Sequence, residues 1–514
     1  MASGYVIRAN QYYDSVFLMR VSKRLSSREG VRQTAVLMGS EKNKRLLEDI
    51  GIRGPELDAA QPNDLIVAVI AETREIVETV LDDLDLALLA LDEGGPTSHH
   101  HTLEDGLIEK PLANLAIFSI PGEYIYREAK KALDAHLNLF IFSSNVQIEE
   151  ELQLKQYAAE RKLLVMGPDC GTSILNGKGI GFANAVRKGT IGAIGPSGTG
   201  LQEFTTQIHN QGFGISHAIG TGSNDLSAEI GGTTTIMALE ALEADTQTEV
   251  ISIIAKPPDR KVLTHLLERT DICSKPVVGC FLGLTDYTSR SSERMHWART
   301  IDEAVIIAIR VSEGIEKQQI IELTEQEREL ARDLRANWTS EQRFIRGLFA
   351  GGTFCYQTQQ IFVEAGMKIR SNAPLDPQNE LAQIDKSQGH TVIDMGDDKF
   401  TLGRPHPMID STIRNQRILV EGQDPTVAVI LLDIILGYNA AIDPAGELLD
   451  SIREAKHTKK EQGGELTVVA SICGTDRDPQ GIDHQRTLLE NADVHVFQSN
   501  MKAALFCTEL LIAS

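Results

Sequence analysis

The chain is poor in cysteine, in aromatic residues and in basic residues, and each shortage excludes a class of protein. Its six cysteines are scattered without a C-x-x-C pair, so a disulfide scaffold and a structural zinc site are poorly supported and a reducing compartment fits best. Fifty basic against 72 acidic side chains give a net charge of -22, which repels a phosphate backbone, so no nucleic-acid partner is expected.

Long apolar runs are also missing. The longest, from Val427 to Leu436, is interrupted by Asp433 and is too short to span a membrane. The first residues, MASGYVIRANQYYD, lack the basic-then-apolar pattern of a signal peptide. The sequence therefore predicts a soluble, cytoplasmic protein with no membrane association.

Short apolar runs alternate with amphipathic stretches along the chain, which predicts an α/β protein of several domains. Strand–turn–helix units of this kind predict doubly wound, flavodoxin-like parallel sheets, in which ligands bind where strands end. A long acidic helix is expected over residues 72–91 and a highly charged one over residues 313–335. The expected blocks are residues 1–92, 112–188, 189–335 and 341–514.

A linker is expected between the first two blocks, because residues 94–111 lack periodicity and contain turn residues. It contains three adjacent histidines, His99, His100 and His101. No cysteine or acidic residue is spaced to complete a site with them, so no metal centre is predicted.

A glycine-rich turn, GPSGTG over residues 195–200, follows the strand TIGAIG and precedes an amphipathic helix. Glycines let the backbone turn tightly and direct its free N–H groups to one point, where the helix dipole favours an anion. An ordinary helix cap is the alternative, since such turns are common. The candidate phosphate-binding residues here are Ser197, Gly198, Thr199 and Gly200.

A second turn repeats this design 154 positions later, in AGGT over residues 350–353. Its candidate phosphate-binding residues are Gly351, Gly352 and Thr353. Two such helix starts, one per sheet domain, could face each other across an interface and hold a phosphate dianion in an otherwise acidic protein.

Several longer runs resemble known families. The run from GPDCGTS to GTGSNDL is similar to the succinyl-CoA synthetase alpha subunit, and FIRGLFAGGTFCYQTQQIF with VIDMGDD and VAVILLDIILGYNAA resembles the C-terminal domain of the beta subunit. Over nearly its full length, including QYYDSVFLMRVSKRL and GDDKFTLGRPHPMIDSTIRNQ, the chain resembles the FdrA family. The resemblance implies a small N-terminal α/β domain, a Rossmann-like CoA-binding-type domain at 112–188 and two flavodoxin-like synthetase domains.

Three departures weigh against a CoA ligase mechanism. The glycine-rich CoA loop near the N-terminus has no counterpart. His296, where the phosphohistidine is expected, stands in RMHWA without flanking glycines, and Lys256 replaces the acid that supports it. The sequence also contains no ATP-grasp module and no GxxxxGK[ST] motif.

The FdrA resemblance implies a component of an oxamate carbamoyltransferase of allantoin breakdown, which acts with two companion proteins and requires no cofactor. Oxalurate and phosphate would be exchanged for oxamate and carbamoyl phosphate by direct transfer. The candidate catalytic residues are Arg404, His406 and Lys256; prolines on both sides of His406 are expected to hold its imidazole and the Arg404 guanidinium rigidly.

Weaker candidates are a helical pair, Arg414 and Arg417, which could form a solvated face, and Asp169 with Cys170, which end a strand. Two alternatives to carbamoyl transfer remain: an ADP-forming acyl-CoA synthetase component that binds CoA, and a non-catalytic scaffold subunit.

Overall fold

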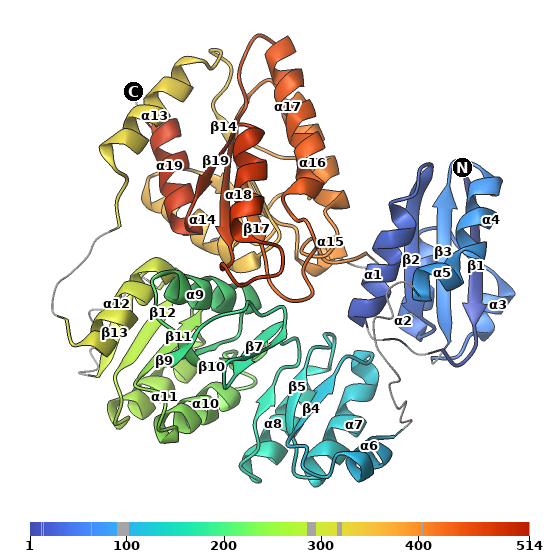
Figure 1. Ribbon diagram of the computed structural model, residues 1–514, viewed down its shortest axis with the longest axis vertical. Coiled ribbons are helices and arrows are strands. Elements are labelled where there is room, and N and C mark those ends of the chain that lie inside the picture. The colour runs from blue at the N-terminus through green and yellow to red at the C-terminus, as the bar shows by residue number, and fades with distance from the viewer. Residues whose placement is uncertain are drawn as a thin grey trace.

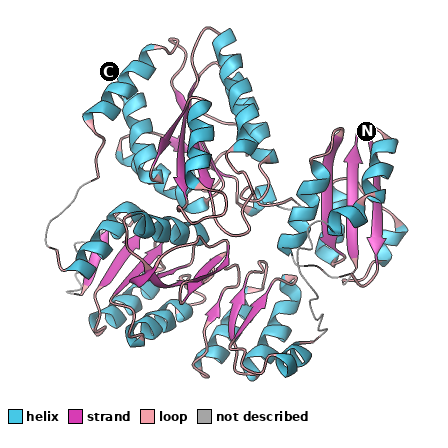
Figure 2. Cartoon of the chain, viewed as in Figure 1, coloured by secondary structure: helices cyan, strands magenta, loops and turns pink. Residues whose placement is uncertain are grey.

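The computed structural model describes residues 1–512 except 12, 14, 63, 90–101, 285–293, 316–320 and 402–403. Four sheets organise these residues, and helices cover their faces (Figures 1 and 2). Within the described part of the chain, no helix is both long and apolar enough to cross a membrane. The mixed α/β architecture predicted from the alternating pattern is confirmed.

The N-terminal unit contains a three-stranded antiparallel sheet of order β1-β3-β2. Its elements are β1 (Ala2–Arg8), α1 (Ser15–Ser26), β2 (Val31–Met38), α2 (Glu41–Asp49), α3 (Pro55–Ala59), β3 (Leu65–Ala71), α4 (Arg74–Asp82) and α5 (Leu84–Leu89). The single helix expected over residues 72–91 is wrong. Instead, Thr73 caps the start of α4, and the helix ends before Asp83, whose carboxylate pairs with Arg28 at 2.6 Å.

The second unit has a small parallel sheet of order β4-β5-β6. Its elements are α6 (Leu103–Glu109), β4 (Leu115–Phe118), α7 (Gly122–Asp134), β5 (Asn138–Ile141), α8 (Ile148–Ala159) and β6 (Val165–Met166). The hairpin that follows, β7 (Thr172–Leu175) and β8 (Lys178–Gly181), precedes the boundary expected at residue 189 but belongs to the next sheet.

That next sheet has seven strands in the order β13-β12-β11-β9-β10-β7-β8, and β9 to β13 are parallel. Its further elements are β9 (Lys188–Gly195), α9 (Gly198–Asn210), β10 (Ile215–Gly220), α10 (Thr233–Ala244), β11 (Val250–Ala255), α11 (Arg260–Asp271), β12 (Val277–Phe281), β13 (Met295–Ala298) and α12 (Ile301–Glu313).

The charged helix expected over residues 313–335 is also wrong. Gly314, with φ +66°, ends α12 in a left-handed conformation. A new helix, α13 (Glu325–Ala336), starts at a capping box in which Thr324 and Glu327 satisfy each other's backbone N–H groups.

The C-terminal unit has a fully parallel six-stranded sheet of order β15-β16-β14-β17-β18-β19. Its elements are β14 (Phe344–Phe349), α14 (Gly352–Glu364), β15 (Ile369–Arg370), η1 (Pro377–Asn379), β16 (His390–Asp394), α15 (Asp398–Thr401), α16 (Thr412–Gln423), β17 (Val427–Ile435), η2 (Gly446–Leu448), α17 (Leu449–Glu461), β18 (Thr467–Cys473), α18 (Ile482–Asn491), β19 (Val494–Phe497) and α19 (Asn500–Ile512).

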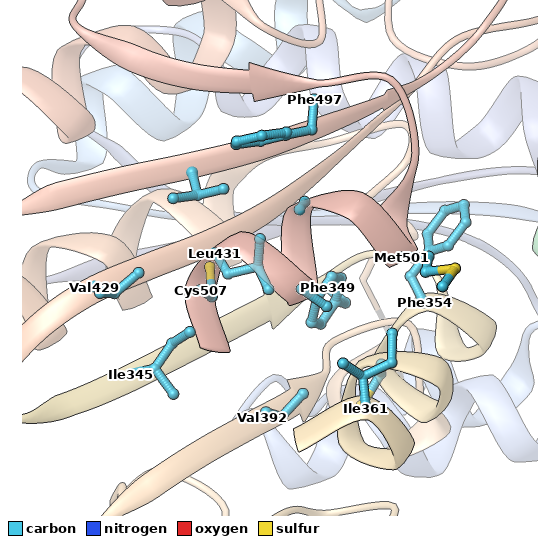
Figure 3. Close-up of a cluster of buried hydrophobic side chains, with 14 of the residues drawn as sticks. Ile345, Phe349, Phe354, Ile361, Val392, Val429, Leu431, Phe497, Met501 and Cys507 are labelled. Carbon is cyan, nitrogen blue, oxygen red and sulfur yellow. The ribbon is translucent and has the colours of Figure 1, made fainter. Parts of the chain in front are cut away.

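A buried apolar cluster fixes the direction of α14 in this unit. Phe349 and Phe354, which flank the turn before the helix, both lie in the cluster, together with Met501 and Cys507 of α19 (Figure 3). Because both ends of the turn are anchored in the core, the start of α14 has little freedom to move.

The seven-stranded and six-stranded sheets meet through α9 and α14, which pack against each other. Polar contacts lock this interface. The amide of Asn184 donates to the carbonyl oxygen of Leu436 at 2.9 Å and to the carboxylate of Asp478 at 2.7 Å, and all three residues are buried. The helix starts of two separate sheets are therefore held side by side.

Candidate anion site between two helix starts

The two predicted turns have the same local geometry. Ser197 caps α9 with φ -103° and ψ 122°, and its hydroxyl accepts the Gly200 N–H at 3.4 Å. Gly351 caps α14 with φ -102° and ψ 116°. Each turn follows an interior parallel strand, β9 or β14, so each helix starts at the carboxyl edge of its sheet, where α/β proteins bind ligands.

The structure brings these turns into direct contact in a reciprocal way. The hydroxyls of Ser197 and Thr353 hydrogen-bond to each other. In return, a Cβ added at Gly351 would lie 3.1 Å from the Thr199 methyl group. The third residue of each turn thus contacts the capping residue of the other, 154 positions away. Thr353 is buried, whereas Thr199 is partly exposed, so the junction is open to solvent on one side.

Unpaired backbone donors gather at this junction. Within the described residues, the N–H groups of Gly198 and Thr199 in α9, and those of Gly352, Thr353 and Phe354 in α14, have no protein acceptor. The first N–H groups of a helix are satisfied by side chains, water or ligands, and they carry the positive end of the helix dipole. An anion placed here would accept hydrogen bonds from both helices.

Two predicted donors are not available, and one of them is the Gly200 N–H, which donates to the Ser197 hydroxyl. The N–H groups of Ala350 and Gly351 donate to the two carboxylate oxygens of Asp433, at 2.9 and 2.7 Å. The Gly351 amide therefore positions the turn and cannot bind a ligand, while Phe354, which the prediction missed, adds an N–H. Asp433 gave a signal in the sequence, because it is the one charged residue that interrupts the apolar run of β17.

Asp433 is balanced by Arg414, whose guanidinium lies 3.0 Å from it. Burial raises the pKa of the Asp433 carboxyl and lowers that of Arg414. The expectation of a solvated face for Arg414 and Arg417 is wrong. Both are buried, because α16 turns them towards acidic partners inside the unit, Asp433 and Glu421.

A second carboxylate, Asp394 at the end of β16, lies against the first residue of α14. A Cβ added at Gly352 would be 2.5 Å from its Oδ2 atom. Burial raises the pKa of Asp394 to about 6, and Lys256 opposes this rise. Asp394 is not among the predicted site residues, although it ends the strand in VIDMGDD.

Lys256 follows β11 and crosses from the seven-stranded unit towards the C-terminal unit. It is an exposed residue, and its Nζ lies 5.0 Å from the ring centroid of Tyr356 on α14. Its effect on the pKa values of Asp394 and Cys355 places its charge near the start of α14. The structure therefore brings this predicted residue to the junction.

The His406 imidazole lies against Gly396, two residues after Asp394. A Cβ added at Gly396 would lie 2.7 Å from its Nε2 atom and 2.5 Å from the Ala350 carbonyl oxygen. Nδ1 accepts the Met408 N–H at 3.2 Å, so in the neutral ring the proton sits on Nε2. Burial, with help from Arg414, lowers the pKa of His406 to about 4, so the ring is a neutral hydrogen-bond donor at pH 7.

Arg404 is not held as expected. The residue is exposed, and its side chain has no hydrogen bond or ion pair with any residue that the structure describes. The Met408 N–H positions the His406 imidazole, but the Arg404 guanidinium, two residues earlier, pairs with no acidic side chain among the described residues.

A buried hydroxyl completes the junction. Thr172 at the start of β7 is 1% exposed, and its Oγ1 has no hydrogen-bond partner among the described residues. A Cβ added at Gly198 would lie 3.1 Å from that oxygen, so the hydroxyl is directed at the first turn of α9. A buried hydroxyl without a partner is costly, and a ligand that accepts its proton would remove this cost.

Comparison with known proteins gives a relative of the whole chain. YahF of Escherichia coli (strain K12) is 41% identical over 512 residues, which cover 99% of each protein. The chain belongs to the YahF family. This relationship fits the FdrA-like, succinyl-CoA synthetase-like family that the sequence resembles.

Three family models match separate segments of this chain. They are the AllF heavy metal-associated domain over residues 1–102, the CoA binding domain over 186–281 and CoA-ligase over 348–509. The CoA binding match thus falls mostly on the seven-stranded unit, not on residues 112–188 where that domain was expected. The two turns lie in the second and third matches.

Partial likenesses extend to the synthetases themselves. The succinate–CoA ligase [ADP-forming] subunit alpha of Staphylococcus epidermidis is 26% identical over 200 residues, 38% of this chain and 63% of that subunit. The crystal structure of PH0766 from Pyrococcus horikoshii OT3 aligns over 82% of this chain and 88% of that chain, at 15% identity and a TM-score of 0.36, a likeness too low to support a conclusion.

The name of the first domain implies a heavy metal, but its residues do not fit one. Soft heavy metals favour thiolate ligands, and residues 1–102 contain no cysteine. Among the described residues of the whole chain, no group of three His, Cys, Asp or Glu side chains could hold an ion. His99, His100 and His101 lie outside the described residues.

The remaining weaker candidates lie in distinct places. His296 is in β13, at the edge of the seven-stranded sheet and opposite Val278. Burial raises the pKa of the Cys170 thiol to about 12, so it is not a nucleophile at neutral pH. Asp169 lies three residues after the end of β6, in a left-handed conformation with φ 56°, and burial raises its pKa.

Proposed function

We propose that this chain is the phosphate-binding subunit of an oxamate carbamoyltransferase, which exchanges oxalurate and phosphate for oxamate and carbamoyl phosphate in allantoin breakdown. The observation that supports it is the contact between Ser197 and Thr353, which joins two helix starts with unpaired N–H groups at one point. The match to an AllF domain supports the allantoin context.

A phosphate dianion suits this junction for electrostatic reasons. Each helix start stabilises a nearby negative charge by roughly 0.3–1 kcal/mol, and by up to about 2 kcal/mol where it is partly buried. Lys256 adds an exposed positive charge beside α14. The chain has a net charge of -22, and these donors are confined to one small site. The site therefore suits a small anion and not a large polyanion, which the rest of the chain would repel.

Direct transfer is favoured over a phosphohistidine relay. His296 lies three strands from β9 in the sheet, a separation of about 14 Å at normal strand spacing. It is also inside a strand, paired opposite Val278, where the backbone cannot carry it to α9. Phosphate at the junction would therefore attack the carbamoyl carbon of oxalurate itself.

The carbamoyl group needs a donor for its carbonyl oxygen, on which negative charge develops during transfer. His406 offers its Nε2–H in neutral form, beside Gly396 and the Ala350 carbonyl. The exposed guanidinium of Arg404, which has no hydrogen bond or ion pair with the described residues, is suited to the oxamate carboxylate. A companion subunit that packs on the exposed loop would order it, in keeping with the two companion proteins that the FdrA resemblance implies.

The proposal is tested by adding a negative charge to the junction without removing a helix cap. Aspartate caps helices as well as serine, so Ser197→Asp should fold but repel a dianion. Isothermal titration of the purified chain with inorganic phosphate should show binding for the wild type and a loss of at least tenfold for Ser197→Asp. Thr73→Asp, which makes the same change at the exposed cap of α4, is the matched control.

Activity is measured with carbamoyl phosphate and oxamate, with and without the companion proteins. Phosphate release is expected only in the complete assembly, and Ser197→Asp should abolish it. If the assembled activity survives Ser197→Asp and Arg404→Ala unchanged, the chain is a scaffold and the proposal is wrong.

The CoA binding and CoA-ligase matches favour one second candidate, an ADP-forming acyl-CoA synthetase component. It requires CoA binding and a ³²P label retained on His296 after incubation with labelled phosphate donors. Carbamoyl transfer requires neither, so the two candidates are distinguished by one labelling experiment and one CoA titration.

A further inference from the structure

Asp394 is held in a way that leaves one carboxylate oxygen free. Its backbone N–H and carbonyl both hydrogen-bond to the side chain of Asn372, each at 2.9 Å, and its Oδ1 accepts the Gly396 N–H at 3.0 Å. Oδ2 has no hydrogen-bond partner within the described residues and lies against Gly352, the first residue of α14. The side chain is fixed, and its free oxygen faces the junction.

A free carboxylate oxygen in this position opposes anion binding. Two like charges within a few ångströms disfavour each other unless one of them carries a proton. A Cβ at position 352 would lie 2.5 Å from Oδ2, so no side chain fits between the carboxylate and the α14 backbone. The carboxylate therefore lies close to Gly352, whose N–H has no acceptor among the described residues. A residue that served only to bind phosphate would not be acidic there.

We propose that Asp394 is a catalytic residue that transfers the proton exchanged between the amide and the phosphate. This inference rests on the proposed carbamoyl transfer. As the oxamate nitrogen forms its bond to the carbamoyl carbon, the bond from that carbon to the phosphate oxygen breaks and its electron pair stays on phosphate. Asp394 Oδ2 takes the proton lost by nitrogen and passes it to a phosphate oxygen, so oxalurate and hydrogen phosphate leave.

The surroundings of Asp394 suit this role. Burial raises the pKa of its carboxyl to about 6, near neutral pH, where a group both accepts and releases a proton efficiently. Lys256 lowers that pKa and also draws the phosphate towards the same space. The charged and titratable groups facing Asp394 come from five elements or loops: Lys256 after β11, Cys355 on α14, Asp397 in its own loop, His406 beside Gly396, and Asp433 on β17.

The test is Asp394→Asn in the complete assembly, assayed with carbamoyl phosphate and oxamate between pH 5 and 9. We expect kcat to fall by about 10²–10⁴-fold, the usual contribution of a positioned acid–base group, and the acid limb of the pH–rate profile near pH 6 to disappear. Phosphate affinity of the isolated chain should be retained or increased above pH 6, because a like charge has been removed. That affinity also reports that the variant is folded.

Two further variants sharpen the result. Asp394→Glu keeps a carboxylate and should recover part of the rate and the acid limb. Asp398→Asn makes the same chemical change at an exposed position four residues away and should leave both unchanged. If the wild type binds phosphate and transfers the carbamoyl group, and Asp394→Asn has the same rate and pH profile, the role of Asp394 is overturned while the proposed function stands. A wild-type assembly that neither binds phosphate nor transfers the carbamoyl group would overturn the proposed function, and this role with it.

Discussion

Replacement of Asp433 by asparagine should loosen the second helix start from inside the C-terminal unit. The Asp433 carboxylate accepts the N–H groups of Ala350 and Gly351 and pairs with Arg414, and all four residues are buried. Asparagine keeps the size of the side chain and one acceptor oxygen. It removes the negative charge and leaves one of the two backbone N–H groups without its partner.

The expected loss of stability follows from these contacts. Removal of one member of a buried ion pair costs about 3–5 kcal/mol, because the remaining charge, here Arg414, is left uncompensated. The lost N–H acceptor costs roughly 1 kcal/mol by itself, but it belongs to the same network and does not simply add. We therefore expect the free energy of opening around β14 and β17 to fall by about 3–5 kcal/mol.

Hydrogen exchange measures this locally, which matters in a chain of several domains whose unfolding is not a single transition. Amides of β14 and β17 should lose about 10²–10⁴-fold in protection, and phosphate affinity should fall because the turn before α14 is no longer anchored. Asp450→Asn removes an exposed partner of Arg453 in the same unit and should change neither quantity. If Asp433→Asn behaves like this control, the buried pair does not hold the turn and the reasoning is refuted.

Two other predictions concern the same junction. Thr172→Val removes a buried hydroxyl that has no partner among the described residues, so hydrogen exchange should show unchanged or higher protection of the β7 amides, while titration shows weaker phosphate binding. A loss of protection would mean that the hydroxyl has a structural partner. His406 has a folded-state pKa of about 4, below its usual value, so as pH falls below about 6.5 the unfolded segment takes up a proton first and stability declines. From pH 7.5 to 5.5 the free energy of opening in the C-terminal unit, measured by hydrogen exchange at each pH, should fall by about 1 kcal/mol more in the wild type than in His406→Gln, and equal falls would contradict this.

The sequence predicted the elements well where a pattern is local. The strand before each turn, the glycines in the turn and the amphipathic helix after it lie within about 20 residues, so periodicity and turn residues were enough to find both helix starts. Helix ends were predicted less well. The charged stretch over 313–335 looks continuous, but the left-handed Gly314 and the Thr324 cap divide it.

Side-chain environments that depend on distant segments were not predictable. Arg414 and Arg417 have the spacing of a solvated helix face. Only the fold shows that Arg414 pairs with Asp433 of β17 and that Arg417 is buried with its local partner Glu421 on the same helix. Asp394 looked like an ordinary strand end, because its importance comes from Gly352, 42 positions earlier. Thr172 was overlooked beside the more reactive-looking Cys170, whose thiol is fully buried.

Both halves of the junction are parts of one polypeptide, which has a consequence for binding. Ser197 lies in the segment matched by the CoA binding domain and Thr353 in the segment matched by CoA-ligase, and α9 and α14 are packed together within this single chain. Their effective concentration is therefore set by the fold and does not depend on subunit association. Phosphate affinity of the isolated chain should thus be independent of protein concentration, whereas transfer activity should rise as companion subunits are added and then saturate. A phosphate affinity that falls when the chain is diluted would show that the junction is completed by a second molecule, and the single-chain site would have to be abandoned.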